Sequence, residues 1–331
     1  MRIAVDAMGG DHAPEAVVKG ALLALQEFPN LEVILTGDVD RIMSLTGDVN
    51  MKGRLTVVNA TEVIRSDEDP VRAFRKKKGA SMVLAAREVA EGRADACLSA
   101  GSTGAYLATG LFGVGRIEGI DRPALAPVLP TKDGTGFVLL DVGANAEVKP
   151  EYLVQFAFMG TVYAEKIRGV KNPRVALLNI GAEDNKGTDL TREAFRLLRE
   201  RDDLNFIGNV EARYLMDGVA DVVVTDGFTG NMVLKTIEGT AGSLMKMVKE
   251  AMTANVKSKI GALLLKSSMM DLKKKMDYEE QGGAALFGLK APVIKAHGSS
   301  DQQAIYHAIH QSMKMVEADV ASFISERLAK K

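Results

Sequence analysis

Several short segments of this sequence combine glycine with residues that can hold a small anion such as phosphate. A glycine-rich turn that leads into a helix exposes backbone N–H groups, and the helix dipole adds positive potential there. Gly101–Gly104 is the best candidate for such a turn, and Gly9–His12 is the next. The residues that we expect to bind phosphate are Gly9, Gly10, Asp11, Gly101, Ser102, Thr103, Gly104 and Asn145.

Side chains that could act on a substrate stand in segments of the same kind. Lys186, Asn231 and His297 each follow a strongly apolar run, as His12 does near the N-terminus. A lysine can bind phosphate through its charge, and a histidine can bind phosphate or donate a proton near neutral pH. Four carboxylates would offset these positive charges or orient the side chains, and they are Asp6, Asp141, Glu183 and Asp226.

The elements that must position these residues alternate regularly along the chain. The predicted strands are Arg2–Asp6, Glu32–Leu35, Leu55–Asn59, Ala94–Ser99, Phe137–Asp141, Arg174–Ile180, Leu204–Gly208, Asp221–Thr225 and Pro292–Ala296. The predicted helices are Pro14–Glu27, Pro70–Lys77, Ala80–Glu91, Ala105–Val114, Glu151–Ile167, Thr191–Arg199 and Asp301–Leu328. Continuous apolar strands that alternate with helices predict an α/β fold, in which helices cover an open, mostly parallel sheet. Residues 125–141 could add a small antiparallel hairpin.

The polar segments come directly after seven of the predicted strands. In a parallel sheet the carboxyl ends of the strands share one edge, where ligands of α/β proteins bind. Turn and helix-cap chemistry alone explains glycine and asparagine in any one segment. Seven segments together, with one lysine and two histidines among them, favour an active site at that edge.

The composition is that of a packed globular protein. The 331 residues are 47% hydrophobic and 26% charged, and the net charge of −1 argues against a nucleic-acid binder. The single cysteine suits a reducing compartment. No apolar run approaches the ~18–20 residues of a membrane span, and the N-terminus enters a strand without a signal-peptide core. We expect a cytoplasmic protein that forms one α/β unit over residues 1–331.

Common cofactor motifs are missing from the sequence. The closest match to a dinucleotide-binding fingerprint, Gly110–Gly115, has its glycine spacing reversed, and neither a P-loop nor a G-x-S-x-G elbow is present. Cys97 lies within a predicted strand and is expected to be a buried core thiol. His307 and His310 lack an evident third metal ligand. We therefore expect no metal site and no cofactor.

Two further segments carry a surface chemistry of their own. Arg72, Arg75, Lys76 and Lys77 form a basic run, which is either a solvated helix face or a docking site for an acidic protein. Residues 245–280 interrupt the strand–helix rhythm and form a helical arm. A dimer interface and a core helix are simple interpretations of the arm, and an interfacial helix on anionic lipid is a sharper one. The apolar residues expected to meet lipid are Ile260, Leu263, Leu264 and Leu265.

Seven ordered motifs over essentially the full chain resemble the bacterial phosphate acyltransferases of phospholipid synthesis. The motifs are MRIAVDAMGGDHAP (1–14), SAGSTGA (99–105), DVGAN (141–145), NIGAEDNKG (179–187), GNVEA (208–212), TDGFTGNMVLK (225–235) and HGSS (297–300). Ser102 departs from the asparagine expected in the second motif. Serine can also cap a helix and donate a hydrogen bond to phosphate. The departure therefore argues only against a role at position 102 that requires a side-chain amide.

The resemblance implies a reaction and partners. The family converts acyl-[acyl-carrier protein] and inorganic phosphate to acyl phosphate, which a membrane glycerol-3-phosphate acyltransferase then uses. Its fold is similar to that of isocitrate and isopropylmalate dehydrogenases and of phosphotransacetylase. The family is described as dimeric and peripherally membrane-associated, so we expect a homodimer at the inner face of the cell membrane. The arm would then make dimer contacts at its base and lipid contacts at its tip.

That reaction requires the enzyme to position phosphate and the thioester, and it does not require a covalent enzyme intermediate. A phosphate oxygen attacks the thioester carbonyl, a tetrahedral oxyanion forms, and the thiolate leaves. The matched motifs assign Lys186 to the phosphate charge and Asn231 to the oxyanion or phosphate, with His12 and His297 as candidate proton donors. Two other activities remain open at this point. A metal- or NAD-dependent dehydrogenase would share the fold, and a non-catalytic scaffold for a carrier protein or a membrane would use the basic and apolar surfaces.

Overall fold

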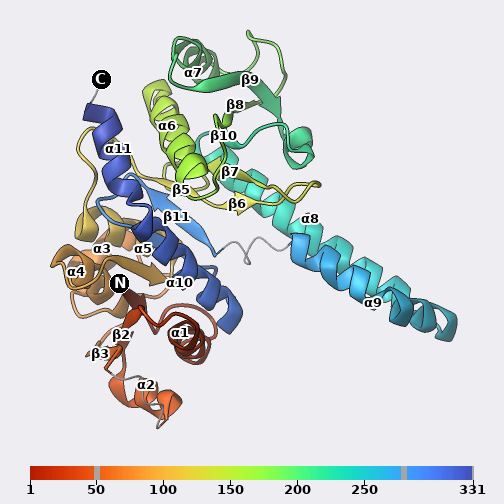
Figure 1. The fold of residues 1–331 in the computed structure, drawn as a ribbon. Helices are drawn as coiled ribbons and strands as arrows, with labels where there is room; N and C mark the ends of the chain where they lie inside the picture. The colour runs from red at the N-terminus through yellow and green to blue at the C-terminus, as the bar shows by residue number, and fades with distance from the viewer. Residues whose placement is uncertain (48–52, 277–281, 330–331) are drawn as a thin grey trace.

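Two mixed, mostly parallel sheets form the body of the protein in this computed structural model, which describes residues 1–47, 53–276 and 282–329 (Figure 1). The first sheet has the order β3 (Leu55–Asn59), β2 (Glu32–Gly37), β1 (Arg2–Asp6), β4 (Ala96–Ser99), β12 (Val293–Lys295), β11 (Ala284–Phe287) and β5 (Ala124–Ala126). The second has the order β6 (Val128–Leu129), β7 (Phe137–Leu140), β10 (Val222–Val224), β8 (Arg174–Asn179) and β9 (Asn205–Glu211). The α/β class is confirmed.

The prediction of one sheet edge was wrong, because the strands are divided between two sheets. In the first sheet β1 pairs in parallel with β2 and β4, and β12 pairs in parallel with β4. In the second sheet β10 pairs in parallel with β7 and β8, and β8 with β9. An apolar run shows that a strand is buried on both faces, but it does not show which strand lies beside it.

The predicted hairpin is confirmed, and it marks the crossing between the sheets. β6 and β7 pair antiparallel, with Val128 opposite Val138. The preceding strand, β5, pairs instead with β11 of the first sheet. The chain therefore passes from one sheet to the other at Pro127, so the two sheets are joined closely beside the hairpin.

Helices cover the faces of both sheets (Figure 1). Those of the N-terminal half are α1 (Glu15–Glu27), α2 (Val39–Thr46), α3 (Pro70–Lys76), α4 (Ser81–Ala90), α5 (Thr103–Thr109) and the π-helical turn η1 (Gly110–Val114). Those that follow are α6 (Pro150–Lys166), α7 (Asp189–Arg199), the 3-10 turn η2 (Ala212–Asp217), α8 (Gly227–Thr253), α9 (Val256–Met276), α10 (Gln302–Glu317) and α11 (Val320–Ala329). The predicted single helix Asp301–Leu328 was wrong: Asp319 has a φ of 47°, a left-handed conformation that ends a helix.

The arm is a helical hairpin that projects away from both sheets (Figure 1). Its first helix, α8, starts at Gly227 and so begins at the end of β10 rather than near residue 245. At about 1.5 Å per residue, its 27 residues span roughly 40 Å. α9 returns along α8. Residues 277–280 of the predicted arm lie outside the described residues.

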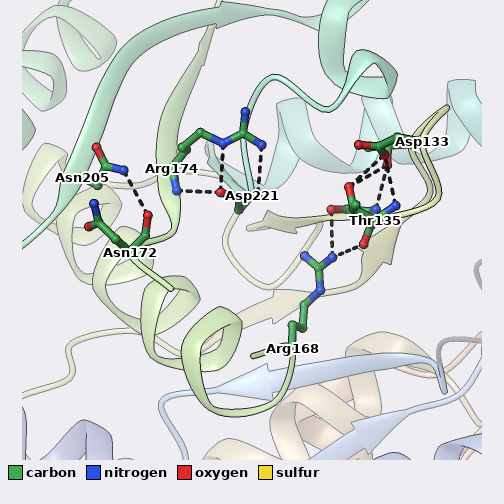
Figure 2. A network of polar contacts seen from close by, with 9 residues as sticks. Asp133, Thr135, Arg168, Asn172, Arg174, Asn205 and Asp221 are labelled. Atoms are coloured by element: carbon green, nitrogen blue, oxygen red, sulfur yellow. Dashed lines mark hydrogen bonds and ion pairs between the residues drawn. The ribbon is translucent and has the colours of Figure 1, made fainter. Parts of the chain in front are cut away.

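A polar network fixes the amino ends of the strands in the second sheet (Figure 2). Arg174 forms an ion pair with Asp221, the residue before β10, at 3.0 Å. Arg168, which follows α6, donates to the carbonyls of Thr135 and Gly136 in the hairpin turn. These contacts lie at the end of the sheet opposite the polar segments, so they hold the scaffold and leave the carboxyl ends of the strands available for a site.

Candidate active site

The carboxyl ends of strands from both sheets line one cavity of about 90 Å³ (the inter-sheet cavity). The first sheet contributes Thr103 after β4 and residues 295–297 at the end of β12. The second contributes Val142 after β7 and residues of α8, the helix that follows β10. Segments that are far apart in the sequence therefore meet here. Of the predicted site residues, Thr103, Asn231 and His297 line this cavity, and they come from the edges of two sheets rather than one.

Three loops of the first sheet pack against one another beside this cavity. The hydroxyl of Ser99 donates to the buried carboxylate of Asp6 at 2.6 Å and accepts from the backbone N–H of Gly101 at 3.0 Å. The backbone N–H of Asp11 donates to the carbonyl of Gly298 at 2.7 Å. Burial raises the pKa of Asp6, and its hydrogen bonds oppose that shift. Asp6 thus orients the loop after β4 through the hydroxyl of Ser99.

The close packing of these loops explains the glycine at position 9. A Cβ atom there would lie 2.6 Å from Asp6 Oδ2 and 2.6 Å from the backbone nitrogen of Gly101. A larger residue would separate the loops after β1 and β4. At the second loop, the Ser102 hydroxyl accepts from the backbone N–H of Ala105 at 3.4 Å and caps α5. The predicted capping by serine is confirmed.

Asp141 organises the corresponding loop of the second sheet. Its carboxylate accepts from the backbone N–H groups of residues 143, 144 and 145 and from the N–H of Leu125. The side-chain amide of Asn145 donates to Asp141 at 2.9 Å and to the carbonyl of Pro123 at 2.8 Å. Both amide hydrogens of Asn145 are therefore used within the loop. Burial raises the pKa of Asp141 in spite of these bonds.

Asp226 positions Asn231 through the first turn of α8. The Asp226 carboxylate accepts from the backbone N–H of Thr229 at 2.8 Å and from its hydroxyl at 2.7 Å. This cap starts α8, and Asn231 follows one turn later on the wall of the inter-sheet cavity. His297 also lines this cavity, and its Nδ1 forms a hydrogen bond with the Ser299 hydroxyl at 2.7 Å. Burial, with the charge of Lys235 added, lowers the pKa of His297.

Other predicted residues lie outside this cavity. Asp11 and His12 line a separate, more open cavity of about 780 Å³ together with Lys19 and Arg41. Lys186 lies in the loop after β8, and its exposed ammonium is 3.8 Å from Glu183. The side-chain amides of Asn179 and Asn209 donate hydrogen bonds to backbone carbonyls of that loop and fix its conformation. The structure thus brings Asn231, His297 and Thr103 together but places Lys186 and His12 elsewhere.

Three charged residues of the cavity were missed by the sequence analysis. Lys235 and Glu238 lie on α8 and form an ion pair at 2.7 Å. Lys295 lies at the end of β12, is only 7% exposed, and donates to the carbonyls of Ala100 and Ala296. Burial lowers the pKa of Lys295 to about 8. The signal available in the sequence was a lysine within an apolar strand, where a charge needs a specific reason.

The residues of the predicted basic run and of the predicted lipid-contacting cluster are exposed, except Lys77. Arg72, Arg75 and Lys76 project from α3 into solvent, whereas Lys77 is partly buried in an ion pair with Glu68 at 2.7 Å. The proposed lipid-contacting residues of α9 are all exposed, with Leu264 at 79%. No helix in the described ranges is long and apolar enough to cross a membrane.

Cys97 is buried as predicted, and burial raises its pKa to about 12.

Comparison with known proteins decides the family. The family described as "Fatty acid synthesis protein" matches residues 1–323. A phosphate acyltransferase of Bacillus licheniformis is 59% identical over 331 residues, covering 100% of this chain and 99% of that protein. A phosphate acyltransferase of Bacillus subtilis is 58% identical over 331 residues, with 99% and 98% of the two chains covered. The chain belongs to the phosphate acyltransferase family. It is therefore an acyltransferase, rather than a dehydrogenase or a non-catalytic scaffold.

Solved structures confirm one part of the predicted fold likeness. A phosphotransacetylase from Streptococcus pyogenes matches with a TM-score of 0.64 at 19% identity, over 96% of this chain and 94% of that one. The EutD phosphotransacetylase from Staphylococcus aureus matches with a TM-score of 0.60 at 18% identity, over 96% and 94%. The fold of this phosphate acyltransferase family member is thus similar to that of phosphotransacetylases. The likeness to isocitrate and isopropylmalate dehydrogenases stays a prediction.

Proposed function

We propose that the protein transfers a fatty acyl group from acyl-[acyl-carrier protein] to inorganic phosphate, giving acyl phosphate for phospholipid synthesis. The observation that carries this proposal is the inter-sheet cavity, whose wall combines Asn231 with Lys235, Lys295 and His297. An amide can donate to an oxyanion, and two ammonium groups suit an anionic co-substrate. The names of the full-length relatives, phosphate acyltransferases, support the same reaction.

Phosphate attacks the thioester directly in this proposal. Asn231 donates to the oxyanion or to phosphate, and the backbone N–H groups of Gly10 and of residues 102–104 supply further donors, since those of Asp11 and Gly101 already donate within the protein. Lys186 contributes charge from the loop after β8, and His12 and His297 are candidate donors of a proton. No metal or cofactor is required. The reacting atoms are held in line, so rate acceleration comes from orientation and charge stabilisation.

The acidic carrier protein docks on the exposed basic face of α3 in this scheme. Arg72, Arg75 and Lys76 project from this face, and the first residue of α3, Pro70, lies against the loop at Gly104, where an added Cβ would be 2.9 Å from Pro70 Cγ. The basic face is therefore close to a phosphate-binding loop. We expect Arg75→Glu with Lys76→Glu to raise the KM for the carrier at low salt, and the control pair Lys171→Glu with Lys290→Glu to leave it unchanged. An unchanged KM in the α3 variant would remove this docking site.

The arm associates with the inner face of the cell membrane and with a second copy of the chain. Ile260, Leu263, Leu264 and Leu265 form an exposed apolar cluster in the part of α9 near its start, beside exposed lysines. Such a surface suits anionic lipid. Leu244 and Met247 on α8, 57% and 65% exposed, provide a second apolar face for a homodimer. Peripheral binding would place acyl phosphate next to the membrane glycerol-3-phosphate acyltransferase.

The phosphate dependence of thiol release tests the proposed reaction. The purified protein is mixed with palmitoyl-[acyl-carrier protein], with and without inorganic phosphate, while free carrier thiol is measured and acyl phosphate is trapped with hydroxylamine. We expect thiol release and a hydroxamate product only when phosphate is present. Release of equal size without phosphate, or no release from folded protein, would contradict the proposal.

A further inference from the structure

Lys295 is a buried ammonium group that faces the inter-sheet cavity. It is 7% exposed, and no carboxylate of the described residues forms an ion pair with it. Burying an unpaired charge is costly, and proteins retain such a group where its charge or its proton is used. The scaffold does not need it, because Lys295 ends β12, whose preceding residues Val293 and Ile294 already fill the core.

The backbone around Lys295 leaves one of its protons for the cavity. An ammonium group has three N–H donors and no acceptor. Two donors are directed at the carbonyls of Ala100, at 3.4 Å, and of Ala296. If the third proton leaves, the neutral amine still satisfies both carbonyls, and its lone pair takes the place of the lost proton. Lys295 can therefore give up and regain a proton without moving its side chain.

The electrostatic surroundings favour easy release of that proton. Burial lowers the pKa of Lys295 to about 8, and the charge of Lys235 on α8 acts in the same direction. Asp6 and Asp11, in the loop after β1, oppose the shift. His297 and Glu238 line the same cavity. A cysteine thiol has a pKa of about 8.5, and simple alkyl thiols are weaker acids, so an ammonium group of pKa about 8 can protonate a departing alkyl thiolate.

We infer that Lys295 carries the proton of the attacking phosphate to the sulfur that leaves the thioester; this inference rests on the proposed function. The overall reaction supplies the proton it needs, because hydrogen phosphate dianion and a thioester give acyl phosphate dianion and a thiol. A phosphate oxygen bonds to the acyl carbon, and the C–S bond breaks with its electron pair on sulfur. The third N–H proton of Lys295 goes to that sulfur. The neutral amine then takes the proton from the hydroxyl of the acyl phosphate, which restores the ammonium group.

Two variants separate a proton carrier from a fixed positive charge. Lys295→Met removes both properties, and Lys295→Arg keeps the charge but holds its proton at all relevant pH values. With palmitoyl-[acyl-carrier protein] we expect both variants to lose turnover by at least ~10²-fold, the usual size of a general-acid contribution. With S-phenyl thiopalmitate, whose aryl thiolate leaves without a proton, we expect the loss of turnover in Lys295→Met to be at least ~10-fold smaller, because only the positive charge toward phosphate is then missing. The exposed Lys290→Met serves as the matched control and should behave as the wild type.

The outcomes distinguish this inference from the proposed function. Lys295→Arg activity within about threefold of the wild type would show that charge alone suffices and would overturn the inference. If Lys295→Met lost turnover equally with the two thioesters, the inference would also be overturned, because the loss would then not come from the missing proton donor. Thiol release by the wild type must depend on phosphate in the same assay. If it does not, the proposed function itself fails.

Discussion

Positive charge exceeds negative charge among the side chains around the inter-sheet cavity. Lys235 and Lys295 face Glu238, whose Oε2 pairs with Lys235 and whose Oε1 is buried without a hydrogen-bond partner. Burial disfavours the charges of Lys295 and Glu238, whereas the Lys235 side chain is half exposed. A dianion such as phosphate would offset two ammonium groups. Binding of phosphate in this cavity, as proposed, would therefore relieve the electrostatic cost of the buried ammonium group of Lys295.

Replacing Lys295 by methionine should stabilise the protein at neutral pH. The folded-state pKa of about 8 lies below the ordinary value of 10.5. Below pH 8 the folded protein buries the charged ammonium group, which costs about 3 kcal/mol of stability. Between pH 8 and 10.5 the folded protein has lost this proton while the unfolded chain keeps it. The free energy of unfolding of the wild type therefore rises with pH over this range. We expect Lys295→Met to be more stable by up to that amount at pH 7 and equal to the wild type above pH 10.5. Urea unfolding of both proteins at the two pH values measures the difference, and a gain that grew with pH would refute the burial cost.

Lys186 offers a test of the loop after β8. Its ammonium is exposed and close to Glu183 alone among the described carboxylates, so it can reorient toward a bound anion. We expect Lys186→Ala to lower kcat by ~10²-fold, the effect of losing one charge-stabilising group. Lys171→Ala, an exposed cation in the turn before β8, is the control. A folded Lys186→Ala enzyme with wild-type turnover would exclude Lys186 from the reaction.

At the scale of elements, α8 joins the site to the arm. Its first turn packs so closely on the loop after β7 that a Cβ on Gly230 would lie 1.9 Å from the carbonyl oxygen of Asp141. Gly239, two turns further on, has no atom within 4 Å of such a Cβ. The base of α8 is therefore fixed by contact with the second sheet, while its outer part is set by helix propensity and by α9.

The two glycines should respond to alanine with opposite signs. Gly230→Ala forces α8 away from Asp141 and should lower the free energy of unfolding by more than about 2 kcal/mol, as other overpacked core sites do. Gly239→Ala should raise it by ~0.5–1 kcal/mol, because alanine favours a helix. Thermal or urea denaturation of the two variants gives both values. Equal effects would show that the contact at the base of α8 is not close.

Lipid binding by the arm can be measured by flotation with anionic vesicles. Leu263→Glu with Leu264→Glu removes two exposed apolar side chains, each worth about 1.5–3 kcal/mol when buried. We expect vesicle binding to weaken by at least ~100-fold as a result. Met43→Glu, on the exposed surface of α2, is the control and should bind as the wild type does. Unchanged flotation of the arm variant would refute the lipid contact.

The elements were more predictable than their arrangement. Strands such as β1 and β8 are continuous apolar runs, and glycines 134 and 136 marked the hairpin turn, where both have positive φ. β11 was missed, because Ala284–Phe287 is short and follows a polar segment. The break at Asp319 was missed too, since an apolar pattern continues on both sides of it. Local pattern defines an element, but tertiary contacts decide where it ends.

At the scale of the whole molecule, the site depends on the meeting of two sheets. Asn231 and His297 could be predicted from their places after strands, yet they belong to different sheets and meet only at the inter-sheet cavity. Lys295 could not be found this way, because it lies within a strand rather than after one; a lysine in an apolar strand was the only signal, and the contact with Ala100 depends on the fold. Sheet order, which the sequence pattern does not specify, creates the site.

In the proposed reaction phosphate attacks the thioester without an acyl-enzyme, and exchange of the acyl group between carrier proteins tests this step. Labelled free carrier protein is incubated with unlabelled palmitoyl-[acyl-carrier protein] and the enzyme, without phosphate. Direct attack predicts no transfer of palmitoyl groups to the labelled carrier until phosphate is added, because no acyl-enzyme forms. Rapid exchange in the absence of phosphate would show that the acyl group leaves its carrier without phosphate, as through an acyl-enzyme, and would contradict the proposed reaction.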